Sequence, residues 1–178
     1  TAGIRPVRDS DNVNAYQFLK WEHTPDTRNT FVLQYYLNLH DRDDVSTGKT
    51  FDPAPLGDPF QLPLDFSLNT ERHNLEFTHH NSSLEHTRFI WGLSAQLDRV
   101  ESPYFIDDQI ELDRETNRAF FNIEHEIDER HIVQLGTLYE SNDFDGDRFS
   151  PRFSYIFKPE PNHSFRYSAS KAIRQPFV

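Results

Sequence analysis

Apolar and polar residues alternate along most of the chain with a period of two. The segment 30–41 shows this most clearly, and one set of alternate positions there holds Phe31, Leu33, Tyr35, Leu37 and Leu39. The other set holds Thr30, Val32, Gln34, Tyr36, Asn38 and His40. Because successive side chains of a β-strand point to opposite faces, this pattern predicts a strand with one apolar face. No segment has a competing helical period, so the chain is predicted to be all-β.

The alternating segments predict about eight strands, joined in chain order as an antiparallel up-and-down meander. Their expected ranges are 14–23, 30–41, 70–80, 86–99, 116–126, 131–141, 149–158 and 163–173. The connections alternate between short ones, at 24–29, 81–85, 128–130 and 159–162, and long ones, at 42–69, 100–115 and 142–148. Short turns at one end of the strands and long polar loops at the other are typical of outer-membrane β-barrels. No change of composition marks a domain boundary, so residues 1–178 are expected to form a single unit.

The last two predicted strands divide most evenly between apolar and polar faces. Phe153, Tyr155, Phe157, Phe165, Tyr167 and Ala169 alternate with Arg152, Ser154, Lys158, Arg166, Ser168 and Ser170. Lipid would accept the first set and a water-filled lumen the second. Backbone groups at membrane depth all need partners, so such strands imply a closed sheet in the complete molecule. A structure that gathered these aromatic side chains in a dry centre would refute the prediction.

Composition narrows the class of protein further. Apolar residues make up only 35% of the 178 residues, yet 16 Phe, 7 Tyr and 2 Trp are too many aromatic residues for a disordered chain. The net charge of -11 argues against nucleic acid as a partner, since phosphate backbones select for an excess of Lys and Arg. Cysteine is absent, which excludes disulfides and thiolate metal sites. No apolar run reaches the length of about 18 residues that a membrane-spanning helix needs. The first residues lack the pattern of a signal peptide, so either one has been removed or the sequence begins inside a larger protein.

The segment "FFNIEHEIDERHIVQLGTLYESNDFDGDRFSPRFSYIFKPEPNHSFRYSASKAIRQP" carries several short motifs in a fixed order. They are Gly136 with Tyr139 and Glu140, then Phe149, Ser150, Pro151 and Arg152, then Asn162 and His163, then Ser170, Arg174 and Pro176. This order and spacing resemble the barrel wall of a TonB-dependent outer-membrane receptor. The earlier segments "RFIWGLSAQLDR" and "FVLQYYLN" are similar to upstream strands of that family. The chain departs from the family pattern at Leu138, where the family usually has Arg.

The resemblance implies a fold and a function. Receptors of this family are barrels of about 22 strands around an N-terminal plug, in the bacterial cell outer membrane. They take up ferric siderophores, cobalamin, haem or sugars with energy from the TonB complex. The chain is expected to be the middle part of such a barrel, with the plug and both barrel ends missing. The implied partners are outer-membrane lipid, the plug, the TonB complex and a small molecule such as a metal chelate; no cofactor is expected.

Arginines on the polar alternate positions are the candidate ligand-binding residues. They are Arg88, Arg118, Arg152, Arg166 and Arg174, and they share that face with Glu76, Glu124, Glu126 and Glu140. Guanidinium groups suit the carboxylates or catecholates of a chelator. The alternative is that these arginines pair with the glutamates or with a plug, because a lumen needs charge compensation wherever it is filled.

Two segments invite a metal-binding interpretation. Asp143, Asp145 and Asp147 with Gly146 copy the opening of an EF-hand loop, but the twelfth position is Ser154 instead of Glu. His79 and His80 are adjacent, so they point to opposite faces of a strand, and His79 is expected at the lipid interface instead. A solvated turn is the preferred interpretation of the aspartates, and no metal site is expected. No nucleophile triad, phosphate-binding glycine loop or isolated carboxylate pair is present, so the chain is not expected to be an enzyme.

Two other folds fit parts of the pattern. A soluble eight-stranded ligand-binding barrel of the calycin type would turn its apolar set inward and its polar set to water. A complete small membrane barrel of eight strands should end in an aromatic residue at the end of its last strand, whereas Pro176, Phe177 and Val178 follow the predicted strand by three residues.

Overall fold

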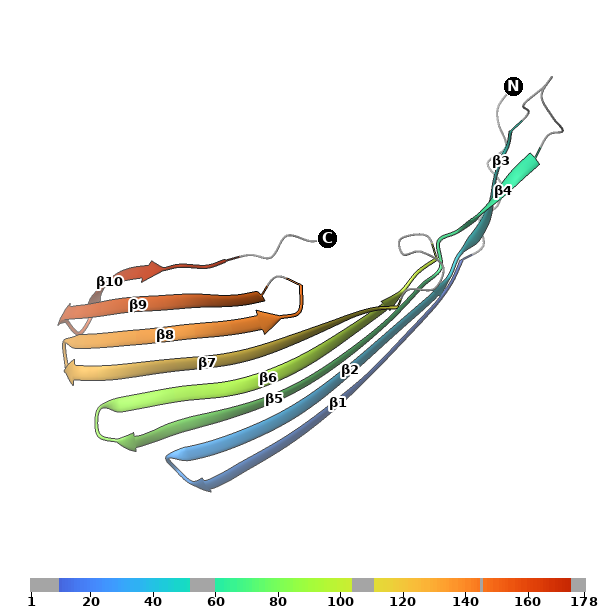
Figure 1. Ribbon diagram of the computed structural model, residues 1–178. Coiled ribbons are helices and arrows are strands. Elements are labelled where there is room, and N and C mark those ends of the chain that lie inside the picture. The colour runs from blue at the N-terminus through green and yellow to red at the C-terminus, as the bar shows by residue number, and fades with distance from the viewer. Residues whose placement is uncertain (1–9, 52–59, 104–110, 145, 174–178) are drawn as a thin grey trace. The chain divides into compact units, whose positions relative to one another are not determined.

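The computed structural model describes residues 10–51, 60–103, 111–144 and 146–173, with only the backbone at 47–51 and 60–63 (Figure 1). These residues form ten strands. Their bounds are β1 Asp11–Asp26, β2 Asn29–Asp43, β3 Val45–Phe51, β4 Phe60–Asp65, β5 Leu68–Leu84, β6 Thr87–Glu101, β7 Leu112–Asp128, β8 His131–Asn142, β9 Gly146–Glu160 and β10 His163–Ser170. Across the described ranges, no helix has the length and apolar character needed to span a membrane.

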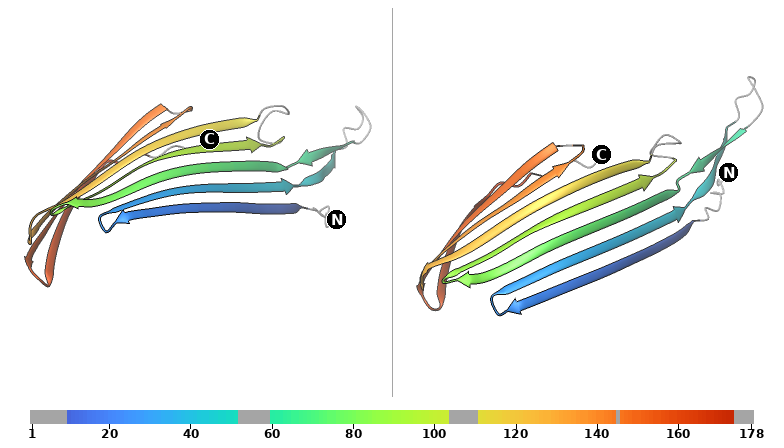
Figure 2. Two further views of the ribbon diagram at one scale, coloured as in Figure 1. Left: turned by 90° about the horizontal axis from the view of Figure 1, so that it is seen from below. Right: turned by 60° about the horizontal axis from the view of Figure 1, so that its bottom comes forward.

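Eight of the strands form one antiparallel sheet in the order β1-β2-β5-β6-β7-β8-β9-β10, which Figures 1 and 2 show side by side. The predicted all-β meander of about eight strands is therefore confirmed. The prediction of a long polar loop at 42–69 was wrong in part, because β3 and β4 form a separate two-stranded sheet there. β-branched residues such as Val45, Thr47 and Thr50 favour extended backbone in this segment.

The short connections are tighter than predicted, because strands continue on both sides of them. Two residues form each turn: Thr27 and Arg28, Glu85 and His86, Glu129 and Arg130, and Pro161 and Asn162. The carboxylate of Asp26 accepts a hydrogen bond from the amide of Arg28 at 2.7 Å, and that of Asp128 accepts one from the amide of Arg130 at 2.8 Å. Such side-chain bonds close a turn locally and set the register of the hairpin.

Each of the first three turns is also hydrogen-bonded to the neighbouring hairpin. The carbonyl oxygens of Arg28, His86 and Arg130 accept hydrogen bonds of 2.8 Å from the amides of Ser82, Glu126 and Lys158. Every donor lies near the turn end of the next hairpin's first strand. The same stagger therefore repeats from hairpin to hairpin, as expected for a sheet built from one repeated unit.

The register places even-numbered residues on one face of the sheet and odd-numbered residues on the other. Arg152 lies opposite Gly136 and Ser170, whereas Phe153 lies opposite Leu135 and Ala169. Contacts between other neighbouring strands join residues of equal parity, for example Phe77 with Trp91 and Arg88 with Glu124. We call these surfaces the even face and the odd face. The predicted division of side chains between two faces is thus confirmed for β7 to β10.

The odd face is not packed against any other layer of the described residues. Ile132 is the single buried apolar side chain among them, at 7% exposure. Large apolar side chains on the odd face are instead exposed. They include Leu33, Leu75, Leu93, Phe121, Leu135, Phe149, Phe153, Phe165 and Tyr167. The aromatic side chains are not gathered in a dry centre, so the arrangement required by a soluble barrel with an apolar interior is not found.

The chain divides into two units, residues 1–17, 37–73 and 98–113, and residues 18–36, 74–97 and 114–178. In the first unit, the base of the β3–β4 hairpin is tied by Asp44, whose side chain is fully buried and paired with Arg42. The carbonyl of Asp44 accepts a hydrogen bond from the amide of Phe66 at 2.8 Å, and its amide donates to the hydroxyl of Ser67 at 3.1 Å. These hydrogen bonds close the base of the β3–β4 hairpin, where it joins β2 and β5.

Candidate functional site

A hollow of about 390 Å³ opens on the even face of the second unit. Three of the five candidate arginines line it, Arg88 from β6, Arg152 from β9 and Arg166 from β10. We call it the arginine hollow. Its other lining residues are Ile90, Asn122, Ile123, Glu124, Gln134, Leu135 and Gly136. Strands far apart in the sequence meet here because the meander places β6 to β10 side by side.

Arg118 does not line the arginine hollow. Its guanidinium donates to the carboxylate of Glu140, directly opposite on β8, at 2.6 Å, and to the side-chain oxygen of Gln96 on β6 at 3.0 Å. Arg118 therefore ties three neighbouring strands together. Arg174, the fifth candidate, lies outside the described residues.

The three arginines of the hollow differ in their partners. Arg88 forms an ion pair with Glu124 and lies 4.0 Å from a carboxylate oxygen of Glu126. Arg166 is held by uncharged groups at 3.1 Å, namely the side chains of Gln134, Ser154 and Ser168. Arg152 makes no hydrogen bond or ion pair with the described residues. Pairing thus accounts for Arg88 and Arg118 but not for Arg152.

A second hollow, of about 460 Å³, adjoins the first and is partly apolar. We call it the Phe120 hollow, since Phe120 and Leu138 lie opposite each other in it. Arg152, Asn122 and Gly136 line both hollows. The ring of Phe120 covers Gly92, where an added Cβ would lie 2.5 Å from the ring. Leu138, which departs from the family pattern, therefore adds to an apolar patch with Phe120 on the even face.

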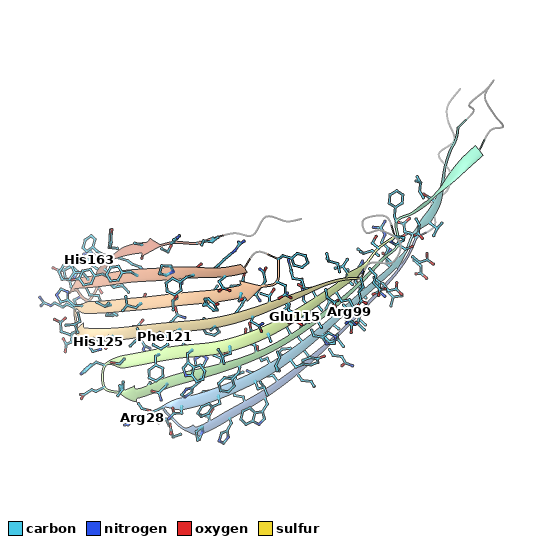
Figure 3. All side chains as sticks on the ribbon, in the orientation of Figure 1. Arg28, Arg99, Glu115, Phe121, His125 and His163 are labelled. Carbon is cyan, nitrogen blue, oxygen red and sulfur yellow. The ribbon has the colours of Figure 1, made fainter. Side chains whose placement is uncertain are left out.

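The odd face carries aromatic and histidine side chains near the short turns. The ring of His79 stacks on Phe31 at 4.3 Å between centroids and accepts a hydrogen bond from the indole of Trp91 at 3.0 Å. His131 stacks on Tyr155 and Phe157 in the same way on β8 and β9. His79 lies within this cluster of aromatic rings, and its place at a lipid interface stays a prediction. Figure 3 shows the side chains that project from the strands, with Phe121 and His125 labelled on β7.

The aspartates weighed as a calcium loop do not converge within the described residues. Asp143 accepts a hydrogen bond from the amide of Glu115 at 3.3 Å, and Asp147 accepts one from the hydroxyl of Tyr139. Asp145 lies outside the described residues. Nowhere in the described part of the chain do three His, Cys, Asp or Glu side chains group so that they could hold a metal ion.

One charged cluster was not predicted from the sequence. Arg99, at the loop end of β6, pairs with Glu111 and Asp113 and lies 3.9 Å from Glu71. The hydrogen bond and charge of Asp113, with the charge of Glu111, raise the pKa of Arg99 above its usual value. One feature of the sequence could have indicated this cluster: Arg99 is the one arginine at an odd position within a described strand.

Comparison with known proteins gives one match. The family model described as "TonB dependent receptor-like, beta-barrel" matches residues 2–177. Neither curated proteins nor solved structures match the chain.

Proposed function

Because the chain belongs to the TonB-dependent receptor β-barrel family, a family of bacterial outer-membrane receptors and transporters, we propose that its strands form part of a transport barrel wall. The odd face contacts outer-membrane lipid, and the even face lines a water-filled lumen. Residues 1–178 act as one wall segment in this proposal. The role is transport and not catalysis.

The distribution of charge between the two faces carries this proposal. Every Lys and Arg on a described strand of the second unit has an even number: Lys20, Arg88, Arg114, Arg118, Arg148, Arg152, Lys158 and Arg166. The acidic exceptions on the odd face, Glu115 and Asp147, lie near the loop ends of β7 and β9. A central apolar band without charge is the surface that hydrocarbon requires.

The height of that band also supports a position in the membrane. On β9, the odd-face residues from Phe149 to Phe157 cover about 26 Å at about 3.3 Å per residue, which a strand tilt of about 40° reduces to about 20 Å of depth. Outer-membrane barrels carry an apolar band about 25 Å tall, flanked by aromatic girdles. The cluster of Phe31, His79 and Trp91 suits the girdle at the turn end. The long connections, including β3 and β4, would then face the cell exterior.

The transported molecule is proposed as a siderophore-type chelate or another scarce nutrient. The supporting observation is a hollow on the even face that is lined by several guanidinium groups, which suit anionic chelators. A plug domain would fill the lumen, and the TonB complex would supply the energy. Deleting the gene and measuring growth on individual ferric chelates under iron limitation tests this substrate class. Undiminished growth on every chelate would contradict it.

Single-cysteine labelling tests the assignment of the two faces. The chain has no cysteine, so each introduced thiol is unique. Phe153→Cys and Arg152→Cys are neighbours on β9, lie on opposite faces and replace exposed side chains. In intact outer membranes, a water-soluble maleimide should modify the thiol at position 152 and not the one at 153. A lipid-soluble maleimide should modify the thiol at position 153.

A corresponding pair of neighbouring residues on β8 provides the control. Leu135→Cys and Gln134→Cys are neighbours on β8, and Leu135 lies opposite Phe153, so their reactivities should follow the same parity. Reactivity toward the water-soluble reagent at position 153 and not at 152 would overturn the proposal, because the apolar face would then meet water.

A further inference from the structure

We infer that Arg152, with Arg166 beside it, forms an anion-binding subsite on the even face for organic solutes that bear carboxylate or phosphate groups. The inference rests on the proposed function, because the even face must be wet. It goes further in assigning unequal roles to the candidate arginines. Arg88 and Arg118 hold strands together, whereas Arg152 is available to a ligand.

The partners of each arginine carry the first step. Arg88 pairs with Glu124 and Arg118 with Glu140, each across neighbouring strands. A guanidinium that is already paired with a carboxylate has its donors occupied and its charge compensated, so it binds a further anion weakly. Arg152 has no such partner among the described residues and is exposed to solvent. It is therefore the candidate of the even face that can offer its donor fork to a ligand.

The charge balance of the arginine hollow carries the second step. The hollow is lined by Arg88, Arg152, Arg166 and a single carboxylate, Glu124. Glu124 compensates Arg88, and it also accepts a hydrogen bond from Gln134 at 2.5 Å. Arg166 is oriented by neutral groups, which fix its position without cancelling its charge. Two positive charges thus remain uncompensated by the residues that line the hollow, a pattern that attracts anions.

The arginine hollow has space for a ligand beside Arg152. Gly136 lies opposite Arg152 across the β8–β9 ladder, and the side-chain oxygen of Asn122 occupies the place that a Cβ of residue 136 would take. The hollow of about 390 Å³ is in the range of small-molecule sites, which run from about 300 to 1,000 Å³. The adjoining Phe120 hollow offers an apolar surface to the uncharged part of the same solute.

Arginine-directed labelling tests the subsite. Outer-membrane vesicles that contain the protein are treated with phenylglyoxal, and modification at each arginine is followed by peptide mass spectrometry, with citrate as the anionic probe. Arg152 should be modified faster than Arg118. Citrate at about ten times its Kd should slow modification of Arg152 about tenfold by mass action, and should leave Arg118 unchanged. Sodium chloride at the same ionic strength should protect far less.

Two variants distinguish a built subsite from diffuse positive charge. Arg166→Gln should raise the citrate concentration needed for protection about tenfold or more, because a hydrogen bond to a charged group contributes about 1.5–3 kcal/mol. Lys158→Gln removes an equal charge from the same face of β9 and should have little effect. Equal effects of the two variants, equal labelling of Arg152 and Arg118, or equal protection by chloride would each overturn the inference.

This test and that of the proposed function can fail separately. Labelling does not depend on the TonB complex or on transport, so a loss of uptake leaves it interpretable. If the cysteine introduced at position 152 is accessible to water, and citrate still does not protect Arg152 of the unsubstituted protein, the lumen assignment stands and the anion subsite is rejected.

Discussion

Leu135 and Leu138 are both on β8, three residues apart, and they lie on opposite faces of the sheet. Leu135 is on the odd face, half exposed, opposite Phe153. Leu138 is on the even face, opposite Phe120 and beside charged neighbours such as Arg118 and Glu140. The same residue type therefore lies on two surfaces to which the proposed function gives different solvents. Leu135 is exposed, whereas Leu138 is partly buried opposite Phe120.

The two faces also differ in how they are held together. Odd-face side chains meet through ring contacts such as Phe77 with Trp91 and Phe89 with Phe121. Even-face side chains form ion pairs and hydrogen bonds that cross from strand to strand, from Gln96 through Arg118 to Glu140 and from Glu124 through Gln134 to Arg166. A polar network can be satisfied on this face because water and side chains both offer partners, whereas lipid offers none.

Introducing a charge on each face gives the largest expected difference. Leu135→Arg should destabilise the folded protein by about 2–4 kcal/mol, the cost of Arg at the bilayer midplane. Leu138→Arg should change stability by only about 0.5 kcal/mol, as for an ordinary wet surface. Urea unfolding in lipid vesicles, followed by Trp fluorescence, measures both. Similar losses for the two variants would mean that the faces do not meet different solvents.

Adding a methyl group at the even-face glycines tests how tightly this face is packed. Gly92→Ala should cost about 1–3 kcal/mol, because its Cβ would lie 2.6 Å from the backbone oxygen of Phe77 as well as against the ring of Phe120. Gly136→Ala should cost less, since Asn122 can move its side chain. Unfolding in urea measures both losses, and Asn122→Ala should rescue Gly136→Ala. Truncating Phe120 should not rescue Gly92→Ala, because the backbone contact remains.

Removing an even-face charge should separate structural arginines from available ones. Arg118→Gln should lower stability by roughly 1–2 kcal/mol, since it leaves the half-buried Glu140 without its ionic partner. Arg152→Gln should change stability by less than about 0.5 kcal/mol. The measurement is again the urea midpoint, with Glu140→Gln completing a double-mutant cycle for Arg118. A larger loss for Arg152→Gln than for Arg118→Gln would contradict the assignment of roles.

The smallest effect is expected at the first short turn, outside both faces. The side chain of Asn29 and the amide of Arg28 hydrogen-bond to Asp26 and hold the pKa of this carboxyl below its usual value of about 3.9. Because the folded pKa is lowered, the contribution of the turn is complete above about pH 4 and is lost as the pH falls through the folded pKa. Amide exchange at Arg28 should accelerate over that range, and Asp26→Asn should not show the change.

Much of the fold follows from alternation alone. All eight predicted strands of the large sheet are present, and residues such as Phe153 and Arg152 lie on opposite faces as the pattern requires. The ends of the strands were less predictable. β10 ends at Ser170 instead of residue 173, while β1 and β5 extend well beyond their predicted limits. Strand ends depend on hydrogen bonds from the neighbouring strand, which a local pattern does not contain.

The candidate site was predictable only in part. Arg88, Arg118, Arg152 and Arg166 each belong to the polar set of alternate positions in their own strand, which is enough to predict that all four share the polar face. Parity does not specify which of them meet a carboxylate, because pairing depends on the stagger of strands that are distant in sequence. Arg118 reaches Gln96 and Glu140 from two different strands, and neither is near it in the chain. The arginine hollow likewise forms where β6 to β10 lie side by side, so that Arg88, Arg152 and Arg166 line one space.

The sequence by itself determined that this chain forms strands with one apolar and one polar face, because side-chain direction along a strand depends only on parity. Tertiary structure decided the partners. The register between β8, β9 and β10 brings Arg152 beside Gly136 and Ser170, and it brings Arg166 to Gln134. Shifting one strand by two residues would keep every side chain on its face and change every pair, so alternation cannot specify the pairs.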